Sequence, residues 1–136
     1  MDFLRSIAIA ASGLKAQAGR IRIISENIAN ADSTAASPGG DPYRRKIVTF
    51  RKDFDRELQA QTVDLGRVAR DQSDFRTRYD PGNPAADING NVKLPNVSSL
   101  VEQMDMRQAQ RSYEANLNVI GATRRMLQRT IDILRA

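Results

Sequence analysis

The chain has 136 residues, with 21 Lys and Arg against 16 Asp and Glu and a formal net charge of +5. Cys, His and Trp are absent, which excludes disulfides, thiol nucleophiles, Cys/His zinc sites and Ser-His-Asp triads. Aromatic residues make up only 5% of the chain, and most of them fall between residues 43 and 79. Because aromatic side chains supply the largest single burials, we expect a small core in the middle of the chain.

The basic excess is spread evenly along the sequence. Residues 1–40 carry 4 basic and 3 acidic groups, residues 41–80 carry 10 and 8, and residues 81–136 carry 7 and 5. An even distribution predicts a mixed-charge, solvated surface, so we expect no nucleic-acid partner. The alternative function is a basic, helical nucleic-acid-binding protein. The local candidates for its phosphate contacts are Arg124, Arg125 and Arg129.

Catalytic and membrane functions find no support in the sequence. No pair of acidic residues has a base or nucleophile at a spacing typical of an active site, so we expect no enzyme, cofactor, metal or small-molecule ligand. Asp2 stands where a cleavable export signal carries basic residues, and Arg5, Lys15 and Arg20 interrupt the apolar residues that follow. We therefore expect neither a cleaved signal peptide nor a membrane span at the N-terminus.

Near the N-terminus an apolar residue recurs every seven positions. Such a repeat returns side chains to nearly one face of a helix, so it predicts an amphipathic helix from about residue 3 to about residue 29. Leu4 and Ile24 widen the apolar stripe, while Gly13 and Gly19 favour the close approach of another helix. The row itself consists of Ile7, Leu14, Ile21 and Ile28.

The C-terminal segment carries a second seven-residue row. The segment lacks Pro and begins at Ser99, which has the spacing of a capping box with Glu102. We expect one helix of roughly 36 residues and about 54 Å, which needs a partner along much of its length. Leu117 and Ile131 broaden the stripe beyond what a two-stranded seam requires. The row consists of Met106, Tyr113, Ile120, Leu127 and Leu134.

The segment between the helices has the composition of a loop followed by a small β-rich module. Ser, Thr, Gly, Asp and Pro dominate residues 31–42 and predict the loop. Between Lys52 and Ala60 the sequence allows either a short helix or a strand, and a hairpin-type turn signal lies at Ile88–Val92. Strands are expected at Arg45–Arg51, Thr62–Ala69 and Asp74–Tyr79.

Together the segments predict a mainly α fold with a small β-rich middle module, whose long N- and C-terminal amphipathic helices pack as a coiled-coil-like core. The expected divisions are an N-terminal helix at 1–30, a loop, β-rich module and linker at 31–98, and a C-terminal helix at 99–136. The apolar rows could simply be the core of a free monomer. Because the helices differ in length, however, part of the longer one is left unpaired, and we expect assembly with copies of the chain or other proteins.

Three asparagines on or beside the helices, Asn27, Asn30 and Asn116, allow two interpretations. They can cap or solvate the helices, as such residues commonly do. They can instead form hydrogen bonds between helices and fix the register, as one buried polar group does in a coiled coil. The sequence leaves both interpretations open.

Both ends resemble the bacterial flagellar rod and hook axial proteins. The resemblance rests on Ala11–Gln17 and Asn27-Ile-Ala-Asn30 at one end and on Met104–Asn116 at the other. Within that family the chain is most similar to the proximal rod proteins, and its loop at 31–42 is longer than the Thr-Gly-Tyr turn of larger relatives. The segments that narrow the resemblance are Pro42–Lys46, Tyr79–Asp87, Val92–Val97 and Gln128–Leu134.

The resemblance implies a structural role in the flagellar basal body. Members of the family leave the cytoplasm through the flagellar type III export apparatus without signal cleavage. They assemble helically into the periplasm-crossing rod, with paired terminal helices in its inner layer. The implied partners are copies of the chain, other rod proteins, the rod–ring adaptor and the distal rod. The residues expected at the assembly interface are the two apolar rows with Leu4, Ile24, Leu117 and Ile131.

Overall fold

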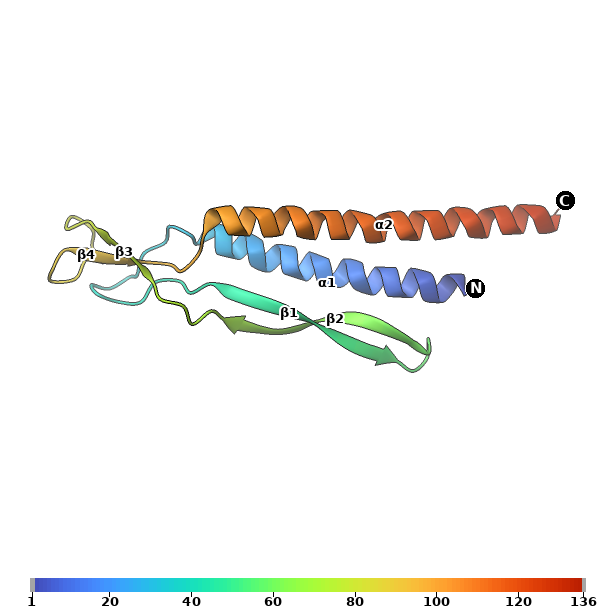
Figure 1. The fold of residues 1–136 in the computed structure, drawn as a ribbon, viewed down its shortest axis with the longest axis horizontal. Coiled ribbons are helices and arrows are strands. Elements are labelled where there is room, and N and C mark those ends of the chain that lie inside the picture. Colours follow the sequence, from blue (N-terminus) through green and yellow to red (C-terminus); the bar gives the residue numbers. More distant parts are fainter. Residues whose placement is uncertain (1, 136) are drawn as a thin grey trace. The chain divides into compact units, whose positions relative to one another are not determined.

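A computed structural model of the chain describes residues 2–135, so Met1 and Ala136, the outer limits of the expected end segments, lie outside the described residues. Two long helices enclose four strands in the sequence, which confirms the predicted fold class (Figure 1). In chain order the elements are α1 (Phe3–Ala29), β1 (Lys46–Asp55), β2 (Ala60–Arg70), β3 (Arg76–Tyr79), β4 (Asn91–Leu94) and α2 (Ser99–Arg135).

Both predicted helices are present, α1 at Phe3–Ala29 and α2 from Ser99 to Arg135, the last described residue. Asp2 caps α1, because its Oδ1 accepts a hydrogen bond from the backbone N–H of Leu4 at 3.1 Å. The predicted capping box at the start of α2 is wrong. The Glu102 carboxylate is buried and accepts hydrogen bonds from Asn27 and Arg45, while the Glu102 N–H donates to the carbonyl of Ser98. The Glu102 side chain therefore belongs to a polar cluster formed by residues distant in the sequence, and it is not available for a local cap.

The middle of the chain forms two hairpins. β1 pairs with β2, and β3 pairs antiparallel with β4, with Arg76 opposite Leu94 and Tyr79 opposite Asn91. The ambiguous segment after residue 51 is strand up to Asp55, followed by a turn in which Gln59 has a φ of 47°. β4 was not expected as a strand, although the turn signal before it is present and Gly90 takes a φ of 80° there.

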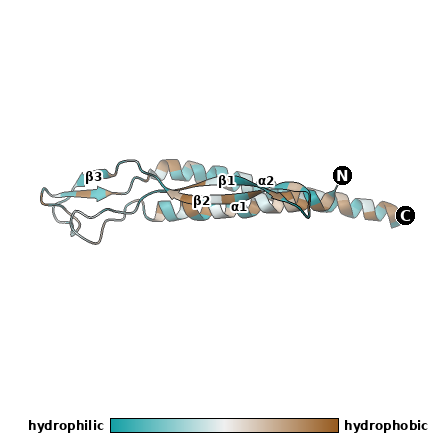
Figure 2. Cartoon of the chain, turned by 90° about the horizontal axis from the view of Figure 1, so that it is seen from below, coloured by the Kyte–Doolittle hydropathy of each residue, from teal (hydrophilic) through white to brown (hydrophobic). Residues whose placement is uncertain are grey.

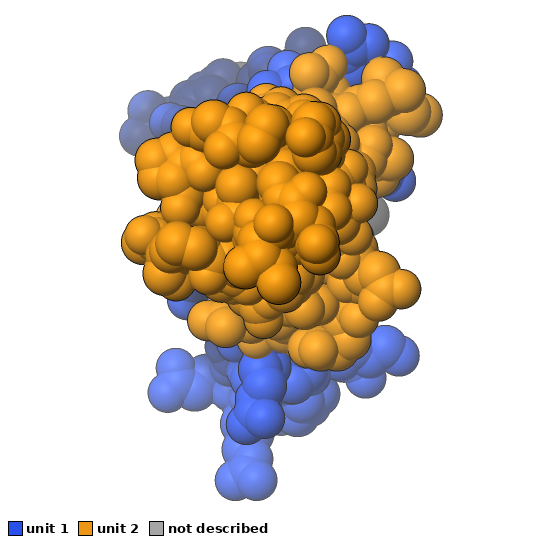
Figure 3. Space-filling view, turned by 90° about the vertical axis from the view of Figure 1, so that its left-hand side faces the viewer, with its two compact units in different colours: residues 1–21, 49–67, 107–136 blue, residues 22–48, 68–106 orange. Residues whose placement is uncertain are grey.

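The chain forms two compact units, shown in blue and orange in Figure 3. Unit 1 comprises residues 1–21, 49–67 and 107–136, and unit 2 comprises residues 22–48 and 68–106. Each unit therefore combines part of the N-terminal helix, part of the β-rich middle and part of the C-terminal helix. Segments far apart in the sequence supply the packing in both.

Part of the core lies in the middle of the chain, as expected, but its buried apolar residues are small or aliphatic instead of aromatic. Phe50, Phe54 and Tyr79 are 43%, 57% and 71% exposed, because two-stranded hairpins leave much of their surface uncovered. In the described part of unit 1 the buried apolar residues are all alanines, at Ala10, Ala16 and Ala109. Unit 2 holds most of the core, which comprises Ile23, Ile24, Ala31, Ala85, Val92, Leu94 and Val97.

In unit 1, α1 contacts α2 on one face and β2 on another, and each contact uses a glycine. A Cβ atom at Gly13 would lie 2.9 Å from Asn116 Nδ2, and one at Gly19 would lie 2.8 Å from Leu65 Cδ2. The backbone N–H of Val63 also donates to Ser12 Oγ at 3.2 Å. Gly13 thus permits the close helix approach that was predicted, whereas Gly19 admits a strand residue instead.

We predict that Gly66→Ala destabilises the chain by about 1–3 kcal/mol, because a Cβ there would lie 2.8 Å from the backbone oxygen of Thr49, which cannot rotate away. Gly82→Ala is the matched control, since nothing lies within 4 Å of its added Cβ. Urea unfolding followed by circular dichroism measures both variants. Equal midpoints for the two variants would contradict the close packing of β1 on β2.

Candidate assembly surface and polar cluster

The two seven-residue rows do not form the most buried faces of the helices. In α1 all four residues of the row are half-buried, while Leu4 beside the row is 72% exposed and Ile24 is fully buried. The row in α2 is half-buried at Met106, Tyr113 and Ile120 and exposed at Leu127 and Leu134, while Leu117 is exposed and Ile131 half-buried. These side chains therefore retain apolar surface that a neighbouring molecule could cover.

A different row of α2 faces α1. It also repeats every seven residues, but its members are polar or small: Glu102, Ala109, Asn116 and Thr123. Asn116 lies against Gly13 in unit 1, and Glu102 accepts a hydrogen bond from Asn27 in unit 2. The sequence analysis missed this row, because Glu, Ala, Asn and Thr carry little hydrophobic signal. Their strict sevenfold spacing was the one sign available.

The fully buried residues of α2 all belong to this row, whereas its large aliphatic side chains are half-buried or exposed. Figure 2 shows apolar turns, in brown, recurring along α2 to its C-terminal end. Ile133 and Leu134 are 75% and 81% exposed near that end. The other large apolar side chains of α2 exposed within unit 1 are Leu117, Val119, Met126 and Leu127.

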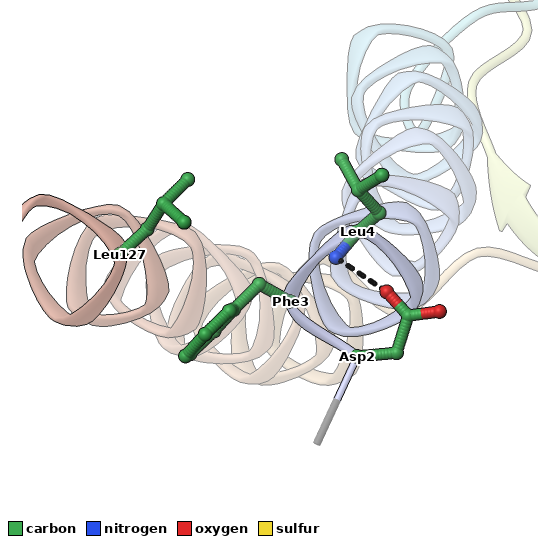
Figure 4. Close-up of a pocket in the computed structure, with 4 residues that line it drawn as sticks. All are labelled: Asp2, Phe3, Leu4 and Leu127. Atoms are coloured by element: carbon green, nitrogen blue, oxygen red, sulfur yellow. Dashed lines mark hydrogen bonds between the residues drawn. The ribbon is translucent and has the colours of Figure 1, made fainter. Parts of the chain in front are cut away.

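The first turn of α1 adds to this apolar surface in unit 1. Phe3 and Leu4 from α1, with Leu127 from α2, line an open recess beside the capping carboxylate of Asp2 (Figure 4). Because Leu4 and Leu127 are both exposed, the recess offers apolar contact area to another molecule.

Net charge differs between the units even though it is even along the sequence. Unit 1 contains 13 basic and 7 acidic residues, a net charge of +6, whereas unit 2 contains 8 and 9, a net charge of −1. Counting charges along consecutive stretches of the sequence does not reveal this difference, because each unit is assembled from separated segments. Arg124 and Arg125 line a shallow recess of unit 1 with Gly121 and Gln128.

Unit 2 contains a polar cluster centred on Asn27, which is 1% exposed. Its Nδ2 donates to the carbonyl of Lys46 at 2.9 Å and to Glu102 Oε2 at 3.1 Å. Its Oδ1 accepts from the N–H of Lys46 at 2.9 Å and from the Tyr43 hydroxyl at 2.8 Å. All four hydrogen-bonding positions of the amide are occupied, so a single side chain joins α1, α2 and the start of β1.

Arg45 completes the cluster by neutralising the buried charge of Glu102. Its Nε lies 2.5 Å from Glu102 Oε1, and its terminal nitrogens lie 3.6 Å from carboxylate oxygens of Asp71 and of Asp105. Burial, the largest single influence, would lower the pKa of Arg45. The hydrogen bond and charge of Glu102, with the two aspartates, outweigh it and raise that pKa.

The other two asparagines bond within their own helices. Asn30 Nδ2 donates to the carbonyl of Glu26 at 2.8 Å, and Asn116 Nδ2 donates to the carbonyl of Ser112 at 2.9 Å. Of the three candidates, Asn27 is the one whose side chain bonds to the other helix in this structure.

We predict that Tyr43→Phe changes how stability depends on alkaline pH. Burial, followed by the nearby charges of Glu26 and Glu102, raises the pKa of Tyr43 from 10.0 to about 12. The folded state therefore holds this proton more tightly, and its contribution to stability is complete below pH 10 and lost as the pH rises to about 12. The variant lacks this loss, and at neutral pH it is less stable by about 1 kcal/mol.

Urea unfolding of the variant and the unchanged chain between pH 8 and pH 12 measures this effect. Tyr79→Phe is the control, because Tyr79 is 71% exposed. Parallel stability curves for Tyr43→Phe and the unchanged chain would contradict the prediction.

Among residues 2–135, no helix has both the length and the apolar character needed to cross a membrane. The same residues contain no group of three or more acidic side chains placed to hold a metal ion.

Comparison with known families defines the class of protein. A family model described as "Flagella basal body rod protein" matches residues 7–35. A second model, described as "Flagellar basal body rod FlgEFG protein C-terminal", matches residues 88–133. The two matches fall on the two terminal helices and their flanks, and they place the chain among the flagellar basal-body rod proteins.

Similar whole proteins identify the particular family. The flagellar basal-body rod protein FlgC of Agrobacterium fabrum is 56% identical over 128 residues, covering 94% of this chain and 92% of the relative. FlgC of Salmonella typhimurium is 38% identical over 133 residues, covering 98% of each chain. FlgC of Bacillus subtilis is 36% identical, covering 98% of this chain and 99% of the relative. The chain belongs to the FlgC family of flagellar basal-body rod proteins.

Membership confirms the resemblance seen in the sequence and makes the chain a structural subunit of the flagellar basal-body rod. The nucleic-acid-binding alternative is not supported.

Proposed function

We propose that the chain polymerises through its terminal helices into the rod, the drive shaft that crosses the periplasm and transmits torque for motility. In this proposal the segments 1–30 and 99–136 make the contacts between subunits, and the segment 31–98 braces them. The role is structural, and no catalysed reaction forms part of it.

The observation that carries the proposal is that different kinds of side chain on α2 are buried and exposed. Its seam toward α1 consists of polar and small residues, whereas most of its large aliphatic side chains lie exposed or half-buried. Burying apolar area yields about 25 cal/mol per Å², so these side chains favour association. An open helical polymer needs contacts between two different surfaces of the subunit, and the rows of α1 and α2 supply two such surfaces.

The proposed interface includes the half-buried and exposed members of both rows. On α1 these are Leu4, Ile7, Leu14, Ile21 and Ile28, with Ile24 behind them in the core. On α2 they are Met106, Tyr113, Leu117, Ile120, Leu127, Ile131 and Leu134. Many shallow contacts of this kind, repeated around a polymer, give a stiffness that no single interface provides.

The proposed partners follow from family membership. They are copies of the chain, other rod proteins, the rod–ring adaptor and the distal rod, together with the flagellar type III export apparatus during transit. Export in this proposal follows the flagellar route, which is supported by the match of residues 7–35 to the rod family model.

We predict that Leu134→Asp abolishes rod assembly without unfolding the monomer. Leu134 is 81% exposed, so its replacement changes monomer stability by about 0.5 kcal/mol at most. A buried Asp at a subunit contact, by contrast, costs several kcal/mol. Thermal unfolding of the purified chain measures the first effect. Swimming in soft agar and the yield of isolated basal bodies, with the variant replacing the chromosomal copy, measure the second.

Asn118→Asp is the matched control, because it adds the same charge at an exposed polar position of α2. Detecting the variant outside the cytoplasm separates failed export from failed assembly. Normal swimming with Leu134→Asp would contradict the proposed interface. An unfolded Leu134→Asp monomer would show instead that the row belongs to the core of the free chain.

A further inference from the structure

We propose that Tyr43, Arg45 and Lys46 form a register clamp, which binds a composite site on α1 and α2 and thereby selects one register of the helix pair. The clamp lies just before and at the start of β1. Half of its binding site is Asn27 of α1, and the other half is Glu102 and Asp105 of α2. The site is therefore complete only when these two parts of the helices lie side by side.

A selection device is needed, because the helices alone specify their register poorly. The apolar rows of both helices repeat every seven residues, as does the small and polar seam row of α2. Sliding one helix by seven residues, about 10 Å, brings apolar side chains back to the positions of the apolar rows and a small or polar side chain back to each position of the α2 seam row. A single polar contact at one place along such a seam removes this degeneracy.

The clamp recognises α1 through main-chain hydrogen bonds at the start of β1. The Asn27 amide forms two hydrogen bonds with the main chain of Lys46, one to its carbonyl and one from its N–H, both at 2.9 Å. A neighbouring strand would bond to a β-residue in the same way. The Tyr43 hydroxyl donates to the same Asn27 Oδ1 at 2.8 Å. An amide side chain supplies this donor and acceptor pair without carrying a charge.

The clamp recognises α2 through the attraction between a guanidinium group and carboxylates. Arg45 binds the carboxylate of Glu102, which is 1% exposed, and its guanidinium also lies 3.6 Å from Asp105 Oδ2. Just before α2, Asn96 Oδ1 accepts from the backbone N–H of Arg45 at 2.8 Å. A slide of about 10 Å would move Glu102 away from Asn27, and the clamp could then bind only one of them. Buried polar groups would be left without partners, which disfavours the shifted registers.

The absence of cysteine from the chain makes the register directly measurable by disulfide cross-linking. Gly13→Cys with Asn116→Cys reports the native register, because these positions are in contact. Gly13→Cys with Ala109→Cys, or with Thr123→Cys, reports a slide of seven residues in either direction. The two shifted reporters also carry Asn116→Ala, so that the new thiol at position 13 has room in every register.

In the chain with an intact clamp we expect oxidation to cross-link the native pair alone. Arg45→Ala, or Asn27→Leu with Glu102→Leu, should raise the yield of a shifted cross-link by about tenfold, which corresponds to a lost preference of about 1.4 kcal/mol. Arg44→Ala is the matched control, because Arg44 lies over Phe75 and donates to the Asp71 and Ser73 carbonyls instead. It should leave the cross-linking pattern unchanged.

Circular dichroism at 222 nm establishes that each variant still forms its helices before cross-linking is scored. Arg45→Ala leaves both helices untouched in sequence, so it decides the question if the double leucine variant fails to fold. Cross-linking confined to the native pair in the helical Arg45→Ala chain would overturn the proposal, as would an equal effect of Arg44→Ala. The experiment uses the isolated chain, so its outcome is independent of whether the chain polymerises as proposed.

Discussion

The buried hydrogen bond between Asn27 and Glu102 is the constraint on which the arrangement of unit 2 depends. A carboxylate and an amide, each 1% exposed, are stable there because every position of the amide is bonded and Arg45 neutralises the acid. Removing one partner would leave the others buried and unpaired, which costs more than the bond itself contributes. The start of β1 and the facing turns of α1 and α2 therefore form one mutually dependent structure.

The choice of polar and small residues for the seam has a second consequence. Gly13 and Ala109 allow close helix approach with little apolar burial, so the large aliphatic side chains are not used up inside the monomer. A subunit built in this way retains exposed and half-buried apolar area on α2. The terminal helices thus pair within the chain and still leave apolar area that the proposed polymerisation would bury.

Sequence periodicity predicted both helices, because an apolar repeat is visible whichever partner covers it. It did not predict which face packs inside the chain, since the seam row of Glu102, Ala109, Asn116 and Thr123 lacks that signal. The core in the middle of the chain was predicted from its aromatic residues, but these contribute little to it because two-stranded hairpins cover little area, which left Phe54 57% exposed. Contacts joining residues 27, 45 and 102 arise only from the tertiary fold, so no local sequence pattern predicts them. At Glu102 these contacts form in place of the predicted capping box.

The most direct measurement of the central constraint is the stability of Asn27→Asp, alone and combined with Glu102→Gln, by urea unfolding near neutral pH. The Asn27→Asp substitution keeps the shape of the side chain but removes both donors and places a negative charge against the Lys46 carbonyl and Glu102. The account predicts a loss of about 3 kcal/mol, part of which returns in the double variant because a neutral amide at position 102 no longer repels the new carboxylate. Unchanged stability of Asn27→Asp, or no recovery on adding Glu102→Gln, would contradict it.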